Sequence, residues 1–153
     1  MPAIYFDMDG TIADLYNVNN WLPMLIAEDS TPYRIAQPLG NLNNLITLCN
    51  QLKEQGYSIG VISWTAKHGS PQYNKRVRAA KVRWLNKYFN VVDEIHVVKY
   101  GTPKHNVTKA NKAILFDDEL NNCNAWNECE NYTSYHVSCI KDIENYCIEL
   151  LCA

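Results

Sequence analysis

Short apolar runs alternate along the chain with longer segments in which apolar residues recur at helical spacing. The apolar runs occupy residues 4–6, 57–62, 95–98, 113–116 and 135–137. Because a parallel strand covered on both faces needs no alternation of polar and apolar positions, such runs indicate buried strands of a parallel sheet. Strands that alternate with helices are typical of an α/β domain, and the alternation continues to the end of the chain.

The predicted helices lie between these runs. Apolar residues recur at helical spacing from Leu42 to Leu52, and Gly56 stands where that helix would stop. The same spacing predicts helices over residues 67–87, 120–130 and 141–151.

Residues 12–38 fit neither pattern. The segment is too broken by prolines for one long helix and more apolar than a plain loop. We therefore expect a flap, in the sense of a reduced cap, over the carboxyl ends of the strands, or else packing over one end of the sheet.

Acidic residues follow two of the predicted strands. Asp7 and Asp9 come directly after the first strand, with Gly10 to turn the backbone, and Asp117 and Asp118 follow the fourth strand. Ligands of open parallel sheets gather beyond the carboxyl ends of the strands, so we expect these carboxylates to share one edge. Crowded carboxylates repel one another unless a cation lies between them. The oxygen-rich set predicts a Mg²⁺ site.

Length, composition and net charge limit the classes of protein to which the chain can belong. A chain of 153 residues with 47% hydrophobic content is long enough for one domain, which we expect to cover residues 1–153. A net charge of -2 gives no overall attraction to nucleic acid or to anionic membranes. No apolar run is long enough to cross a bilayer, and no basic leader precedes the first strand. We expect a soluble, cytoplasmic protein without a membrane partner, and the oligomeric state stays open.

The cysteines and the basic residues of the chain can each be interpreted in more than one way. The six cysteines contain no C-x-x-C pair, so reduced thiols are expected rather than disulfides or a zinc site through Cys129, His136 and Cys139. Residues 67–87 hold basic side chains and no acidic one. They are either the solvated face of a helix or a positive surface that attracts a polyanionic substrate.

Four motifs resemble those of the haloacid dehalogenase superfamily of Mg²⁺-dependent phosphohydrolases. An apolar strand leads into D-x-D-G-T at residues 7–11, a second strand ends at Ser63, and a fourth ends in Asp117-Asp118. Lys104 is the best match to the lysine motif upstream of the last acidic strand, with Lys99 and Lys109 as rivals. The resemblance spans nearly the whole chain and implies a three-layer, Rossmann-like fold with a short flap in place of a full cap.

The resemblance also implies roles for these residues. Asp7 would be the nucleophile and Asp9 the general acid and base, in a reaction through an aspartyl-phosphate. Mg²⁺ would be held by Asp7, by the backbone carbonyl of Asp9, and by Asp117 or Asp118. The predicted substrate-binding residues are Thr11, Ser63, Trp64, Thr65 and Lys104.

A weaker resemblance concerns the substrate. Residues 63–88 are similar to a segment of the phosphatase domain of polynucleotide kinases, and the chain also resembles small nucleotidases, although Thr65 stands where the former often have arginine. These resemblances imply a nucleotide or a nucleic-acid 3'-phosphate end as substrate, with Trp64, Tyr33 and Arg34 available to contact a base. The alternatives are a phosphatase for a sugar phosphate or another metabolite, and a non-catalytic binding protein on the same scaffold.

Overall fold

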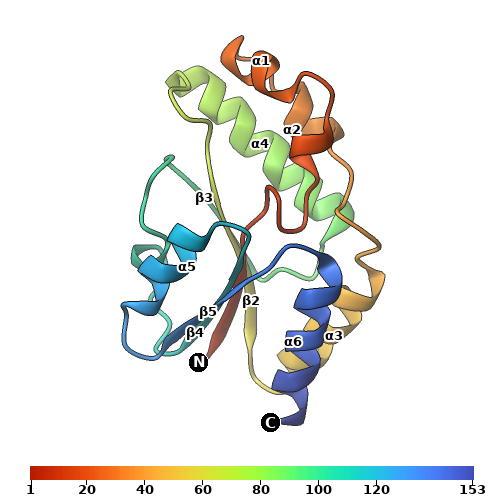
Figure 1. Cartoon of the computed structure of the whole chain (residues 1–153), viewed down its shortest axis with the longest axis vertical. Coiled ribbons are helices and arrows are strands. Elements are labelled where there is room, and N and C mark those ends of the chain that lie inside the picture. The colour runs from red at the N-terminus through yellow and green to blue at the C-terminus, as the bar shows by residue number, and fades with distance from the viewer.

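A computed structural model describes residues 1–153 and contains one five-stranded parallel sheet in the order β3-β2-β1-β4-β5 (Figure 1). Its strands are β1 (Ala3–Phe6), β2 (Ser58–Trp64), β3 (Glu94–Val98), β4 (Ala113–Asp117) and β5 (Tyr132–His136). The predicted central parallel sheet is therefore confirmed, with every predicted strand present.

β1 is the central strand, and its register brings the acidic segments together. Phe6 pairs with Val61 of β2 on one side and with Phe116 of β4 on the other. The backbone N–H of Asp7 donates to the carbonyl of Phe116 at 2.8 Å. The residues that follow β1, β2 and β4 thus leave the sheet at the same edge.

Helices cover both faces of the sheet, which gives the three layers that were predicted (Figure 1). α3 (Asn43–Glu54) and α6 (Ile140–Cys152) pack with the lower part of α4 (Pro71–Tyr88) against Ile4 and Phe6 of β1. α5 (Leu120–Asn127) covers the opposite face, where Trp126 packs against Tyr5 and Leu115. Alternate residues of the buried strand β1 therefore face two different apolar clusters.

Several element boundaries differ from the predicted ones. β5 runs from Tyr132 to His136 rather than over residues 135–137, because it pairs with the whole of β4, and α5 ends at Asn127 rather than near residue 130. α4 begins at Pro71, where Ser70 caps the helix by accepting a hydrogen bond from the N–H of Tyr73. Residues 67–70 therefore form a loop rather than the first helical turn that was predicted.

Residues 12–38 form a chain of short elements that lies over one end of the sheet. They contain a 3-10 turn η1 (Leu15–Asn17) and the helices α1 (Trp21–Ile26) and α2 (Thr31–Ile35). Leu15 and Tyr33 pack against Tyr73, Val77 and Ala80 of α4, and these residues form a third apolar cluster. We call residues 12–38 the flap from here on, without implying that it moves.

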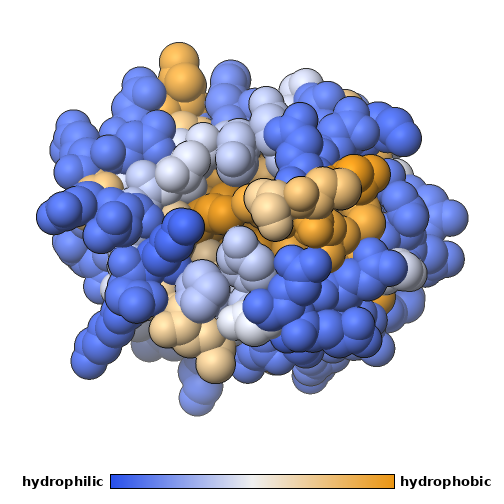
Figure 2. All heavy atoms as spheres, turned by 90° about the horizontal axis from the view of Figure 1, so that it is seen from below, coloured by the Kyte–Doolittle hydropathy of each residue, from blue (hydrophilic) through white to orange (hydrophobic).

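The surface is largely hydrophilic in the view from below, with hydrophobic residues gathered in a band near its middle (Figure 2). None of the helices is both long and apolar enough to span a membrane. All six cysteines are free.

Candidate active site

Asp7 comes directly after β1, is buried, and has a hydrogen-bond partner at each of its two carboxylate oxygens. Lys104, which begins the 3-10 turn η2 (Lys104–Asn106), donates to Asp7 Oδ1 at 2.8 Å, and Thr11 donates to Asp7 Oδ2 at 3.2 Å. Gly10 has a φ of +82°, and a Cβ there would overlap the Asp118 carboxylate. The glycine of the D-x-D-G-T motif is thus required both by the turn and by the close approach of the second acidic pair.

The acids that follow β4 reach the same place. Lys104 donates to Asp117 Oδ2 at 2.7 Å, so its ammonium group lies between Asp7 and Asp117. The Thr11 hydroxyl lies 3.1 Å from Asp118 Oδ1. The predicted convergence of the early and late acidic pairs is what the structure contains. Lys99 and Lys109 are exposed, whereas only 4% of Lys104 is accessible, so Lys104 is the lysine brought to the acids.

Asp9 is turned away from the other acids toward α4. Its Oδ2 accepts a hydrogen bond from Lys81 at 2.7 Å, and the same ammonium group donates to Ser63 Oγ at 2.7 Å and to the Trp64 carbonyl at 2.7 Å. Lys81 is completely buried. The two acids of the D-x-D motif therefore have separate lysine partners.

Lys81 was not predicted as a site residue, because it belongs to the basic residues 67–87 that were expected to form a solvated helix face or a positive surface. That assignment is wrong for this residue. The signal was present in the helical spacing, since Lys81 follows Val77 by four positions and precedes Trp84 by three, within the apolar stripe of α4. The other basic residues of α4 are exposed, as expected for a solvated face: Lys75, Arg76, Arg78, Arg83 and Lys87.

Burial and neighbouring charges shift the pKa values of the four acids in different directions. Burial pushes the pKa of Asp7 upward, but the charge of Lys104 and hydrogen bonds to the carboxylate outweigh it and leave the pKa below its usual value. Burial raises the pKa of Asp9 despite the opposing charge of Lys81. Burial and the nearby charge of Asp7 raise the pKa of Asp117 to about 6 and that of Asp118 to about 8.

One acidic cluster has the geometry of a metal site. Asp7, Asp117 and Asp118 each offer a carboxylate oxygen, and these oxygens all lie within 4.8 Å of one another. With Asp9 included, four carboxylates face the two ammonium groups of Lys81 and Lys104, so two negative charges are left over when all are ionised. Hard oxygen donors with this excess charge fit a divalent cation such as Mg²⁺. The Asp9 carboxylate is not part of the cluster, and neither are Cys129, His136 and Cys139.

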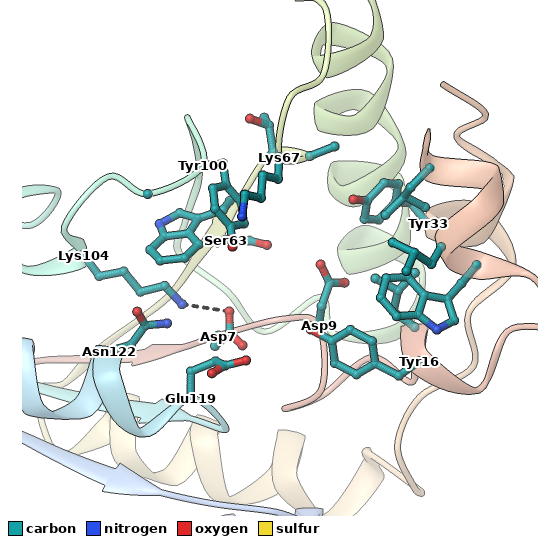
Figure 3. Close-up of a pocket in the computed structure, with 18 of the residues that line it drawn as sticks. Asp7, Asp9, Tyr16, Tyr33, Ser63, Lys67, Tyr100, Lys104, Glu119 and Asn122 are labelled. Carbon is teal, nitrogen blue, oxygen red and sulfur yellow. Dashed lines mark hydrogen bonds and ion pairs between the residues drawn. The ribbon is translucent and has the colours of Figure 1, made fainter. Parts of the chain in front are cut away.

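A cavity of about 570 Å³ opens above the acids (Figure 3). Asp7, Asp9 and Lys104 lie at its floor, and aromatic residues form two opposite walls. The flap wall contains Tyr16, Trp21 and Tyr33, and the opposite wall contains Trp64 and Tyr100. The volume is in the range of small-molecule sites, about 300–1,000 Å³.

The structure distributes the other predicted residues unevenly around this cavity. Ser63, Trp64 and Thr65 line it, and the Trp64 indole donates to the carbonyl of Thr102 at 2.9 Å. Thr11 does not line it, because its buried hydroxyl is engaged with Asp7 and Asp118. Arg34 is exposed and donates to Thr31, so of the two flap residues predicted to contact a base only Tyr33 lines the cavity.

No protein-family model and no curated protein sequence matches the chain. Its structure is nevertheless similar to solved structures of phosphatases, which confirms the three-layer α/β fold predicted from the sequence.

Two of the similar structures are D,D-heptose 1,7-bisphosphate phosphatases. The crystal structure of the enzyme from Burkholderia thailandensis has a TM-score of 0.61 at 12% identity, over 100% of both chains. That from B. bronchiseptica, complexed with magnesium and phosphate, has a TM-score of 0.55 at 9% identity, over 98% of this chain and 99% of the other. At these identities the likeness establishes the fold alone.

Proposed function

We propose that the protein is a Mg²⁺-dependent phosphomonoesterase that works through an aspartyl-phosphate. The observation that carries this proposal is the state of Asp7, a carboxylate kept ionised by Lys104 at the floor of a cavity. An ionised carboxylate can act as a nucleophile toward phosphorus. The nearby cation relieves the repulsion between this nucleophile and an anionic phosphate.

In the first step, an Asp7 oxygen forms a bond to phosphorus while the ester P–O bond breaks. The leaving oxygen takes a proton from Asp9, whose raised pKa suits a carboxyl group that must carry one. In the second step, Asp9 removes a proton from water, the resulting hydroxide bonds to phosphorus, and the bond between phosphorus and Asp7 breaks. The products are inorganic phosphate, the free alcohol and the original carboxylate.

The remaining residues bind and orient the phosphoryl group. Lys104 and the Ser63 hydroxyl face the cavity floor, where they can donate to phosphate oxygens. Asp7, Asp117 and Asp118 would hold Mg²⁺, as would the backbone carbonyl of Asp9 according to the motif resemblance. When bound there, the ion offsets negative charge on the transferring phosphoryl group.

The aromatic walls favour a substrate with a flat apolar part. We propose a nucleoside monophosphate, whose base lies between the flap and the wall of Trp64 and Tyr100 while its phosphate reaches Asp7. The exposed basic residues of α4 do not line the cavity, so a mononucleotide is favoured over a nucleic-acid 3'-phosphate end.

A sugar phosphate is the second candidate substrate. It is favoured by the two similar structures, which are D,D-heptose 1,7-bisphosphate phosphatases. A polar sugar would be served by the side chains of Glu119, Asn121 and Asn122 at the edge of the cavity.

A substrate panel tests both candidates. Phosphate release is measured with Mg²⁺ for nucleoside monophosphates, sugar phosphates and 3'-phosphorylated oligonucleotides, at low and high salt. Higher kcat/KM for the mononucleotides, with little dependence on salt, supports the proposal. A preference for sugar phosphates supports the second candidate, and a salt-sensitive preference for oligonucleotides supports a nucleic-acid end. Release from no ester at all would favour a non-catalytic binding protein.

A further inference from the structure

We propose that Lys81 is a positioning residue, which fixes Asp9 for proton transfer and Ser63 for phosphate binding. The inference rests on the proposed phosphatase activity and assigns a function to a side chain that none of the four motifs contains. Lys81 comes from the third turn of α4, whereas the residues that it contacts follow β1 and end β2.

The ammonium group of Lys81 is fully used. It has three N–H donors, and the Asp9 carboxylate, the Ser63 hydroxyl and the Trp64 carbonyl each accept one at 2.7 Å. The ring of Tyr33 from the flap lies 4.9 Å from the same nitrogen. The four contacts come from the loop after β1, from β2 and from the flap, so Lys81 joins the parts that surround the cavity floor.

The contact with Ser63 determines which way its hydroxyl can act. Ser63 Oγ accepts from Lys81, and no other hydrogen bond engages this hydroxyl. Its proton is therefore free to point into the cavity, where a phosphate oxygen would accept it.

The contact with Asp9 selects one carboxylate oxygen for chemistry. Oδ2 is held by Lys81, whereas Oδ1 has no hydrogen-bond partner and the residue lines the cavity. The carboxylate is also held apart from Asp7, whose oxygens have Lys104 and Thr11 as partners. A buried ammonium group is costly for stability compared with an apolar side chain, so the presence of Lys81 at this fully buried position favours a role in positioning.

Leaving-group dependence distinguishes positioning from a merely structural role. The Lys81→Met variant is assayed for kcat/KM, which covers the steps up to formation of the aspartyl-phosphate, with an alkyl phosphate and with p-nitrophenyl phosphate. An alkoxide needs a proton from Asp9 to leave, whereas p-nitrophenolate is a weak base and does not. We expect kcat/KM to fall about a hundredfold for the alkyl ester, within the range of general acid catalysis, and less than about tenfold for the aryl ester.

Three companion variants complete the experiment. Asp9→Asn should show the same dependence on the leaving group, and adding Lys81→Met to it should cause little further loss for the alkyl ester. Ser63→Ala should weaken inhibition by inorganic phosphate, and Lys81→Met should weaken it to a similar degree. Lys75→Met changes an exposed lysine of the same helix and should leave every value near that of the parent protein.

The outcomes separate this inference from the proposed function. If the parent protein releases no phosphate from any ester, the proposed function fails. If the parent is active and Lys81→Met slows both esters equally, with phosphate inhibition unchanged, the positioning role is overturned. Thermal melting establishes that the variant is folded, and if Lys81→Met does not fold, Lys81→Gln retains a donor and is assayed in the same way.

Discussion

The floor and the walls of the cavity are built from different kinds of structure. The floor contains Asp7 and Lys104, which are buried and form an ion pair of 2.8 Å, and Lys104 forms a second ion pair of 2.7 Å with the buried Asp117 at the end of β4. The walls contain Tyr16 and Tyr100, which stand on short elements and loops and are 46% and 44% exposed. These two floor residues, proposed to take part in the reaction, are therefore buried, whereas Tyr16 and Tyr100, proposed to contact the rest of the substrate, are accessible.

This difference has a consequence for how substitutions act. A change at the floor leaves a buried charge without its partner, which costs far more than the loss of one exposed contact. A change at a wall removes apolar contact area but leaves no unpaired charge. Floor variants should therefore lose the reaction for every substrate, while wall variants should change the choice among substrates.

The largest expected effect tests the floor. Asp7→Asn removes the nucleophile, so phosphate release should fall for all esters alike by about 10⁵-fold or more, as in other covalent mechanisms. Circular dichroism should show a folded protein, because the asparagine oxygen can still accept a hydrogen bond from Lys104 while its amide group donates to the Thr11 hydroxyl oxygen. Glu54→Gln, an exposed acid on α3, is the matched control and should retain full activity. A variant as active as the parent would refute the assigned nucleophile.

Removal of the metal should be nearly as severe. Chelation by EDTA should lower kcat/KM by about a hundredfold or more, because the ion contributes several kcal/mol to stabilising the phosphoryl charge. Added Mg²⁺ should restore activity and raise the Tm of the parent protein, since a ligand that binds only the folded state stabilises it. Asp117→Asn should abolish this rise in Tm, and Glu54→Gln should keep it. Activity that survives EDTA would contradict the metal site.

Substitutions of wall residues should have a smaller effect on KM, and the effect should depend on the substrate. Trp21→Leu and Tyr100→Leu each remove one aromatic surface, which should raise KM for nucleoside monophosphates about tenfold, in line with the 1–3 kcal/mol typical of base stacking. KM for glycerol phosphate, which has no ring to stack, should stay the same. Tyr57→Leu, at the opposite end of β2, is the control. Equal changes for both substrates would remove the distinction between floor and walls.

The floor could be predicted from the sequence because its residues follow apolar runs in a fixed order. Asp7, Asp117 and Ser63 each adjoin a buried strand, and parallel strands bring their carboxyl ends to one edge. Lys104 was preferred to its rivals from the motif resemblance. Lys81 was not predicted, because as a basic residue it was grouped with the other lysines and arginines of residues 67–87. Its spacing nevertheless places it in the apolar stripe of α4.

The walls could be predicted only in part. Trp64 and Tyr33 were expected to contact a base and do line the cavity, but Tyr16 and Trp21 were not identified, because the flap has no sustained periodicity and is held by long-range contacts. Glu28 adopts a left-handed backbone conformation, and its carboxylate accepts hydrogen bonds of 2.7 Å from both the N–H and the hydroxyl of Ser70. Trp84 donates to the carbonyl of Ala36 at 2.7 Å. Pairings over more than forty residues leave no local pattern in the sequence. Cytoplasmic location and the single-domain extent stay predictions.

The smallest expected effect concerns stability, and it sharpens the description of the floor as a site crowded with negative charge. Burial and Asp7 raise the pKa of Asp118 to about 8, above the ordinary value of 3.8. The folded, metal-free protein therefore binds more protons at this group than the unfolded chain, so the group's contribution to stability decreases as the pH rises from about 4 to about 8. Asp118→Asn does not titrate, so in EDTA its Tm should exceed that of the parent by a margin that grows between pH 5 and pH 8. Mg²⁺ should reverse this order, because the ion stabilises only the parent's complete set of carboxylates. A margin that does not change with pH, measured by melting against Glu54→Gln as the control, would show that Asp118 is not under this repulsion.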